Sequence, residues 1–73
     1  MAALGERELN QLRDHGIELN NIMADVIFNA RTGNFEKAIR ASNRLLEASE
    51  QTQRFIQMLK LLLERQMSGR MHL

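Results

Sequence analysis

The stretch RTGN, residues 31–34, is the one strong helix stop in a chain of 73 residues that contains no proline. Gly33 suits the left-handed backbone that commonly follows a helix, and Arg31 places a cation at the negative end of the helix dipole. Asn34 is a favoured residue for capping the next helix. On both sides of this stretch Leu, Ala, Glu, Arg, Gln and Met dominate, and these residues favour helices. The chain is therefore predicted to be all-α.

One tight corner between two long helices predicts an antiparallel two-helix hairpin, which at this length forms a single domain. We expect the hairpin over residues 6–67, with flexible ends at residues 1–5 and 68–73. Within it, the first helix should cover residues 6–31, the turn residues 32–34 and the second helix residues 35–67.

In the first helix, apolar and small residues recur at alternating steps of three and four, the spacing that keeps one face against a neighbouring helix. They are Leu9, Leu12, Gly16, Leu19, Met23, Val26 and Ala30. Gly16 costs a helix about 1 kcal/mol relative to Ala. We interpret it as a point where another helix approaches closely; a break at residues 14–16, followed by a restart, is the alternative.

The second helix carries more apolar surface than one neighbour can cover. A first stripe consists of Ala38, Ala41, Leu45, Ala48, Thr52, Phe55, Leu59 and Leu62. Beside it lie Phe35, Ile39, Leu46, Ile56 and Leu63. At about 100° per residue the two sets span roughly 200°, whereas a helix that faces one neighbour needs about 100°. The first helix can therefore cover only one side of the second.

A chain of this size rarely gains more than about 3–5 kcal/mol from its own core, so it usually needs a disulfide, a metal or a partner. The absence of cysteine excludes disulfides and thiolate metal sites. A second copy would complete a four-helix bundle with two-fold symmetry, and a different helical protein would satisfy the same requirement. The residues expected to anchor the partner are Leu45, Leu46, Phe55, Ile56, Leu59, Leu62 and Leu63.

Residues 33–47, GNFEKAIRASNRLLE, resemble the corner and second helix of a tetratricopeptide repeat. The match rests on Gly33, Asn34, Phe35, Ala38, Ile39 and Leu45. Upstream, where such a repeat has large aromatic residues, this chain has Ile22, Val26 and Asn29, and no second copy of the pattern follows. Any short helix–helix corner needs a glycine, a cap and small side chains, so we interpret the stretch as structural.

A row of cations follows one edge of the second helix and predicts an alternative use. Lys37, Arg40 and Arg44 lie at helical spacing, and Arg54 follows several turns later. Such a ridge can contact phosphates of a nucleic acid. Against this use, the chain has no Tyr or Trp for base stacking, and its net charge is only +1.

We find no pattern that predicts catalysis, a cofactor or a metal site, and we expect the chain not to be an enzyme. Asp14, His15 and Glu18 include an H-x-x-E spacing, but a metal needs more ligands and a supporting shell. We interpret these three residues as a solvated polar face.

The expected function is that of a non-enzymatic protein–protein interaction module, a small helical adaptor or chaperone-like protein that acts through the second helix. Its partner would be a second copy or another helical protein. In plan it is similar to the hairpin co-chaperones of bacterial type III secretion. The alternative, a small dimeric nucleic-acid-binding regulator, is similar in plan to the Rop family. No apolar segment predicts a signal peptide or a membrane span, so we expect a cytoplasmic protein.

Overall fold

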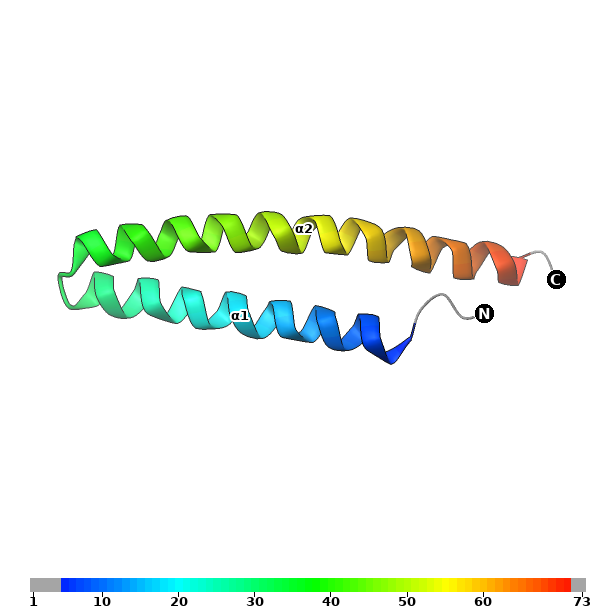
Figure 1. Ribbon diagram of the computed structural model, residues 1–73, viewed down its shortest axis with the longest axis horizontal. Helices are drawn as coiled ribbons and strands as arrows, with labels where there is room; N and C mark the ends of the chain where they lie inside the picture. Colours follow the sequence, from blue (N-terminus) through cyan, green and yellow to red (C-terminus); the bar gives the residue numbers. More distant parts are fainter. Residues whose placement is uncertain (1–4, 72–73) are drawn as a thin grey trace.

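A computed structural model describes residues 5–71, which form two antiparallel helices, α1 (Glu6–Arg31) and α2 (Phe35–Met71), joined by a tight corner (Figure 1). The Cα atoms extend over 59 × 17 × 13 Å, so the hairpin is a rod one layer thick. The prediction of an all-α hairpin is confirmed. Completion as a four-helix bundle involves a second chain and stays a prediction.

The N-cap residue of α1 is Gly5, which adopts an extended backbone and has no side chain to cap the helix. The side chain of Glu8 instead reaches back to the N-cap residue, where its Oε1 accepts a hydrogen bond from the Gly5 N–H at 3.0 Å. This bond, together with the Glu8 backbone N–H, lowers the pKa of the Glu8 carboxyl below its ordinary value. The resulting stabilisation is present above the ordinary carboxyl pKa and is lost as the pH falls through the lowered value.

The corner is a Schellman motif, in which two backbone N–H groups past the helix satisfy carbonyls of its last turn. The Gly33 N–H donates to the Ala30 carbonyl at 3.3 Å, and the Asn34 N–H donates to the Asn29 carbonyl at 2.8 Å. Gly33 has φ of +81°, the left-handed conformation predicted for it. The Asn34 carbonyl accepts the first bond of α2, from Ala38, while its side-chain amide donates to the Thr32 hydroxyl.

Both helices are continuous. Helix α1 runs through Gly16 without a break, so the interpretation of one continuous helix is confirmed and the alternative of a break at residues 14–16 is wrong. The predicted end of α2 at residue 67 was wrong, because the helix continues to Met71. No proline follows Met67, and a single glycine, Gly69, costs only about 1 kcal/mol, so nothing in the sequence stops the helix there. The predicted flexible ends at residues 1–4 and 72–73 lie outside the described residues.

One line of side chains on each helix faces the other helix, and we call these two lines the seam. On α2 the seam is the predicted first stripe, from Ala38 to Leu62, and all its members are buried or half-buried. On α1 it consists of Glu8, Leu12, His15, Leu19, Ile22, Val26 and Asn29. The predicted α1 stripe was therefore wrong in part, because Leu9, Gly16, Met23 and Ala30 are exposed.

The seam is a thin core. Its most buried members are Ile22, Ala38, Ala41, Ala48, Leu59 and Thr52, and among the described residues no large side chain is fully buried. Helix α2 also extends beyond the start of α1 (Figure 1). The hairpin by itself thus buries little apolar surface, as expected for a chain of this size.

We predict that Gly33→Ala destabilises the hairpin by about 1 kcal/mol, because an L-residue with a side chain is strained at this positive φ. A Cβ atom at this position meets nothing within 4 Å, so steric contact is not the cause. Gly33→Asn, which tolerates the left-handed region, should cost less. Urea unfolding followed by circular dichroism at one protein concentration measures both. Equal stability of the Ala variant and the original chain would contradict the assignment.

Candidate protein-interaction face

The two broad sides of the hairpin differ in chemistry, and the position of a residue relative to the seam decides its side. On a helix, the residue that follows a seam position is rotated by about 100° to one flank, and the residue that precedes it is rotated to the other. Because the helices are antiparallel, the following residues of both helices lie on the same side. Asp25 and Arg44 both precede seam positions, and their ion pair of 3.6 Å joins the two helices on the opposite side.

The side formed by residues that follow the seam is apolar. We call it the apolar side. Its large side chains are exposed: Phe35, Ile39, Leu46 and Met67 are each more than 60% accessible. It consists of Leu9, Met23 and Ile27 of α1 and Ile39, Leu46, Ile56 and Leu63 of α2, together with Phe35 and Met67, which continue the same flank of α2 one turn beyond each end of this set. The charged residues that follow seam positions are Arg13 and Lys60, and the uncharged polar ones are Asn20, Ser42, Ser49 and Gln53.

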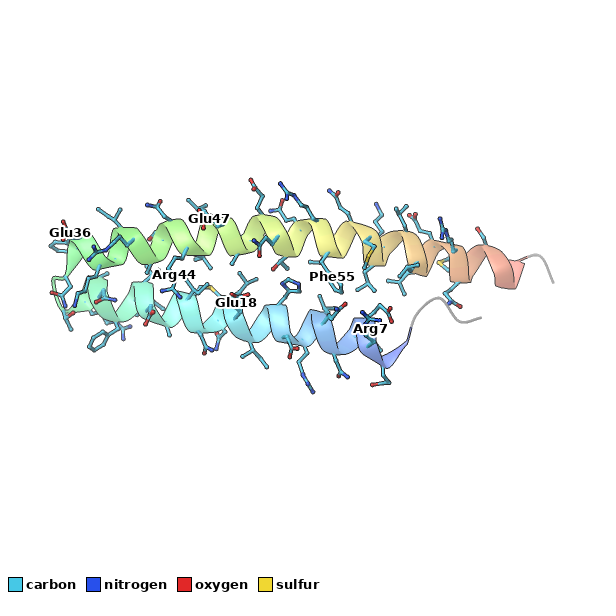
Figure 2. All side chains as sticks on the ribbon, in the orientation of Figure 1. Arg7, Glu18, Glu36, Arg44, Glu47 and Phe55 are labelled. Atoms are coloured by element: carbon cyan, nitrogen blue, oxygen red, sulfur yellow. The ribbon has the colours of Figure 1, made fainter. Side chains whose placement is uncertain are left out.

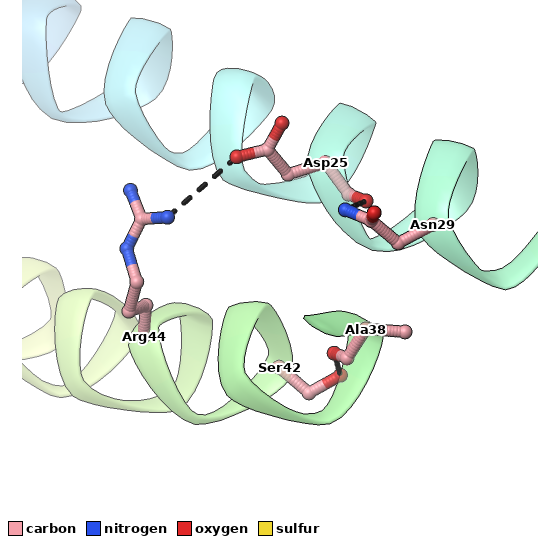
Figure 3. Close-up of polar contacts among 5 residues, drawn as sticks. All are labelled: Asp25, Asn29, Ala38, Ser42 and Arg44. Atoms are coloured by element: carbon pink, nitrogen blue, oxygen red, sulfur yellow. Dashed lines mark hydrogen bonds and ion pairs between the residues drawn. The ribbon is translucent and has the colours of Figure 1, made fainter. Parts of the chain in front are cut away.

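The side formed by residues that precede the seam is mainly polar, although the exposed residues Phe28, Met58 and Leu61 also precede seam positions. We call it the polar side, and it comprises Asp14, Glu18 and Asp25 of α1 with Lys37, Arg40 and Arg44 of α2. Figure 3 shows the Asp25–Arg44 ion pair that spans the two helices. Both side chains are more than half exposed, so the pair stabilises the hairpin by less than about 1 kcal/mol. The same view shows Asn29 donating to the Asp25 carbonyl and Ser42 donating to the Ala38 carbonyl.

The structure divides the predicted partner anchors between two locations. Leu46, Ile56 and Leu63 lie exposed on the apolar side. The others lie on the seam, and Figure 2 shows Phe55 directed from α2 toward α1. These seam residues are Leu45, Phe55, Leu59 and Leu62.

Sequence reasoning missed the contribution of α1 to the exposed apolar surface. The predicted α1 stripe places Leu9 and Met23 in the α1–α2 contact, and it does not include Ile27. Leu9, Met23 and Ile27 each follow a seam residue by one position, which places them on the apolar side. This signal can be used only when the seam residues of α1 are known. Phe28, Met58 and Leu61 are also exposed, and they lie on the polar side because each precedes a seam position. Ile17 is exposed as well and lies outside both sides.

Three residues of the predicted basic ridge have acidic neighbours. Arg44 pairs with Asp25 at 3.6 Å, Arg40 with Glu36 at 4.0 Å and Arg54 with Glu50 at 3.6 Å. Lys37, Arg40 and Arg44 line one shallow groove, but Asp25 and Asn29 line it with them. The positive field along the ridge is therefore partly compensated. Phosphate binding by Lys37, Arg40, Arg44 and Arg54 stays a prediction.

His15 does not belong to a solvated polar face, and this prediction was wrong. Its Nδ1 lies 3.1 Å from the hydroxyl of Thr52, which is 7% exposed, and its ring packs 5.1 Å from that of Phe55. The pair satisfies two polar groups inside the seam and fixes the level at which the helices meet. Among residues 5–71, no group of three or more His, Cys, Asp or Glu side chains could hold a metal ion.

No protein-family model, curated protein or solved structure matches this chain. Neither described helix combines the length and the apolar character that crossing a membrane requires. The candidate site therefore rests on the geometry of the hairpin, and its clearest feature is the apolar side.

We predict that Thr52→Val destabilises the hairpin by about 1 kcal/mol, because it leaves a His15 nitrogen without its partner in the seam. The double variant His15→Leu with Thr52→Val should recover this loss, since both polar groups are then replaced by apolar ones. Ser42→Ala is the matched control, because the Ser42 hydroxyl bonds only within its own helix. Urea unfolding of the four chains forms the test. A Thr52 variant that costs no more than the Ser42 variant would show that the bond contributes nothing.

Proposed function

We propose that the chain is a non-enzymatic protein–protein interaction module, a small helical adaptor or chaperone-like protein that works by burying its apolar side against another protein. The surface that acts is wider than first expected. It combines the flank of α2 that carries Leu46, Ile56 and Leu63 with the adjoining flank of α1 that carries Leu9 and Met23.

The observation that carries this proposal is the concentration of exposed apolar side chains on one side: nine of the thirteen large apolar residues that are exposed in the described part of the chain lie on the apolar side. Single exposed apolar residues are ordinary on a protein surface, whereas a continuous apolar patch marks an interaction site. Here the exposed apolar side chains run from Phe35 beside the corner to Met67 near the far end of α2. Fully burying one such Leu, Ile, Phe or Met side chain is worth about 1.5–3 kcal/mol. The thin seam gives the hairpin a reason to gain this burial from a partner.

The form of the surface favours a helical occupant. The apolar side runs along two long helices that pack side by side. Two such helices form a groove that can accept the apolar stripe of a third helix. The large residues of the apolar side recur on α2 at steps of seven, as in Ile39 with Leu46 and Ile56 with Leu63. A partner would therefore bring a helix with the same periodicity, along with few charges at the centre of the contact.

We predict that Ile39→Glu with Leu46→Glu abolishes association through this side without unfolding either helix, because both side chains are more than 60% exposed in the hairpin. Asn43→Glu with Gln51→Glu is the matched control, since it adds the same charge to exposed positions of α2 outside the apolar side. Sedimentation reports association, and a dye that fluoresces on apolar surfaces reports a side left uncovered.

The original chain should either associate or bind the dye, and the control should behave like it. If the original chain associates, the Ile39 and Leu46 variant should be monomeric and should bind more dye through the apolar residues that remain. If the original chain is monomeric, the variant should bind less dye than it does. In both cases the circular dichroism of the variant should stay helical. A chain that is monomeric and also fails to bind the dye would rule out the proposal, as would a double variant that behaves like the original chain.

A further inference from the structure

The exposed apolar residues that α2 contributes to the apolar side are arranged symmetrically along the helix. Phe35 and Met67 lie equally far from Gln51, one before it and one after it. The same holds for Ile39 and Leu63, and again for Leu46 and Ile56. All of them belong to the apolar side. Reversing the direction of α2 about Gln51 thus places each large side chain on the level of another.

Two of the three large apolar residues that α1 contributes to the apolar side are symmetric about a centre of their own. Leu9 and Met23 lie equally far from Gly16, and all three follow seam positions. The centres of the two helices lie at one level of the hairpin. The Thr52–His15 bond establishes this, because Gln51 precedes Thr52 on α2 and Gly16 follows His15 on the antiparallel α1. A single axis through that level therefore relates Leu9 to Met23 on α1 and the three pairs on α2, whereas Ile27 is related to Gly5.

Gly16 suits this central position. A Cβ atom added to it meets nothing within 4 Å, so the hairpin itself does not need a glycine there. Glycine in a helix interior costs about 1 kcal/mol relative to Ala. On the axis, however, two copies of α1 would meet glycine to glycine, and their backbones could approach closely. The close approach expected from the sequence then occurs between chains.

The unequal lengths of the helices choose between the two possible directions of such a pair. With His15 level with Thr52, α1 begins near the level of Leu61, so Leu63 and Met67 extend past it. If two hairpins stacked with their corners at the same end, α2 would lie over the partner's α1, which stops at that same level and leaves both residues uncovered. If the corners lie at opposite ends, α2 lies over the partner's α2, where Phe35 and Ile39 cover them.

We infer that the occupant of the apolar side is a second copy of this chain, laid antiparallel about a two-fold axis that is perpendicular to the helices at the level of Gly16 and Gln51. This inference rests on the proposed function and names its partner. The product is a four-helix bundle with the polar sides outward. In it Phe35 meets Met67, Ile39 meets Leu63 and Leu46 meets Ile56, each pair across the two chains.

Disulfide trapping tests this arrangement, and the chain has no cysteine of its own to interfere. One preparation carries Phe35→Cys and another Met67→Cys, both at positions more than 60% exposed in the hairpin. Each preparation is oxidised alone, and a third sample is oxidised after both chains have been unfolded and refolded together. Asn43→Cys, outside the apolar side, is the matched control.

The mixed sample should form cross-linked dimers at least about tenfold more than either chain alone, since a disulfide requires Cα atoms within about 7 Å. In the antiparallel pair the two Phe35→Cys positions are separated by about 48 Å along the direction of the helices, because a helix rises about 1.5 Å per residue. The Asn43→Cys control should stay uncross-linked. Preferential self-linking of Phe35→Cys would overturn the antiparallel arrangement.

A complementary pair of charges gives a second test that does not depend on oxidation. Leu46→Glu and Ile56→Lys should each weaken self-association about a hundredfold, because each buries a charge against an apolar partner. Mixing the two chains should restore association, since the Glu of one then faces the Lys of the other. Failure of the mixture to associate would overturn the assigned register.

These outcomes separate the inference from the proposed function. A chain that stays monomeric at all concentrations and binds the apolar-surface dye would overturn the second-copy assignment, while leaving the apolar side in need of a different helical protein. A monomer that also ignores the dye would overturn both.

Discussion

The level at which the two helices meet is the constraint on which the rest of the structure depends. Two features fix it: the Schellman corner at Gly33, which reverses the chain in the fewest residues, and the Thr52–His15 bond near the middle of the seam. Once this register is set, every residue of either helix is assigned to the seam, the apolar side or the polar side. A shift by one position would exchange these assignments.

The hairpin meets the polar requirements of folding more fully than the apolar ones. Among the described residues, no buried side-chain nitrogen or oxygen lacks a hydrogen-bond partner. The seam, by contrast, is lined by small residues such as Ala38, Ala41 and Ala48, which bring the helices close but bury little area. The larger side chains Ile39, Leu46 and Ile56 lie outside it. Association would supply the burial that this close but narrow contact omits.

The division into two sides also gives the molecule an orientation. Opposite charges on the polar side, such as Asp25 and Arg44, are solvated and nearly balanced, which keeps that side compatible with water. The apolar side carries Arg13 and Lys60 at positions that follow the seam, and long cationic side chains can bury their stems while their charges reach solvent. The hairpin thus presents one side that is mainly charged and one that is mainly apolar.

The sequence by itself determined the two helices, because these depend on local helix propensity, and their corner, because it depends on the backbone freedom of Gly33. It also determined the seam of α2, because the small and apolar residues from Ala38 to Leu62 recur at steps of three and four. It could not determine the face that α1 presents. Leu9 and Met23 come directly after the seam residues Glu8 and Ile22, and their spacing fits a helix face equally well. The pattern also gives no sign that His15 is part of the contact. Only the packing of the two helices decides which residues of α1 face α2, because there the Thr52 hydroxyl gives His15 a hydrogen-bond partner and Ile22 is buried.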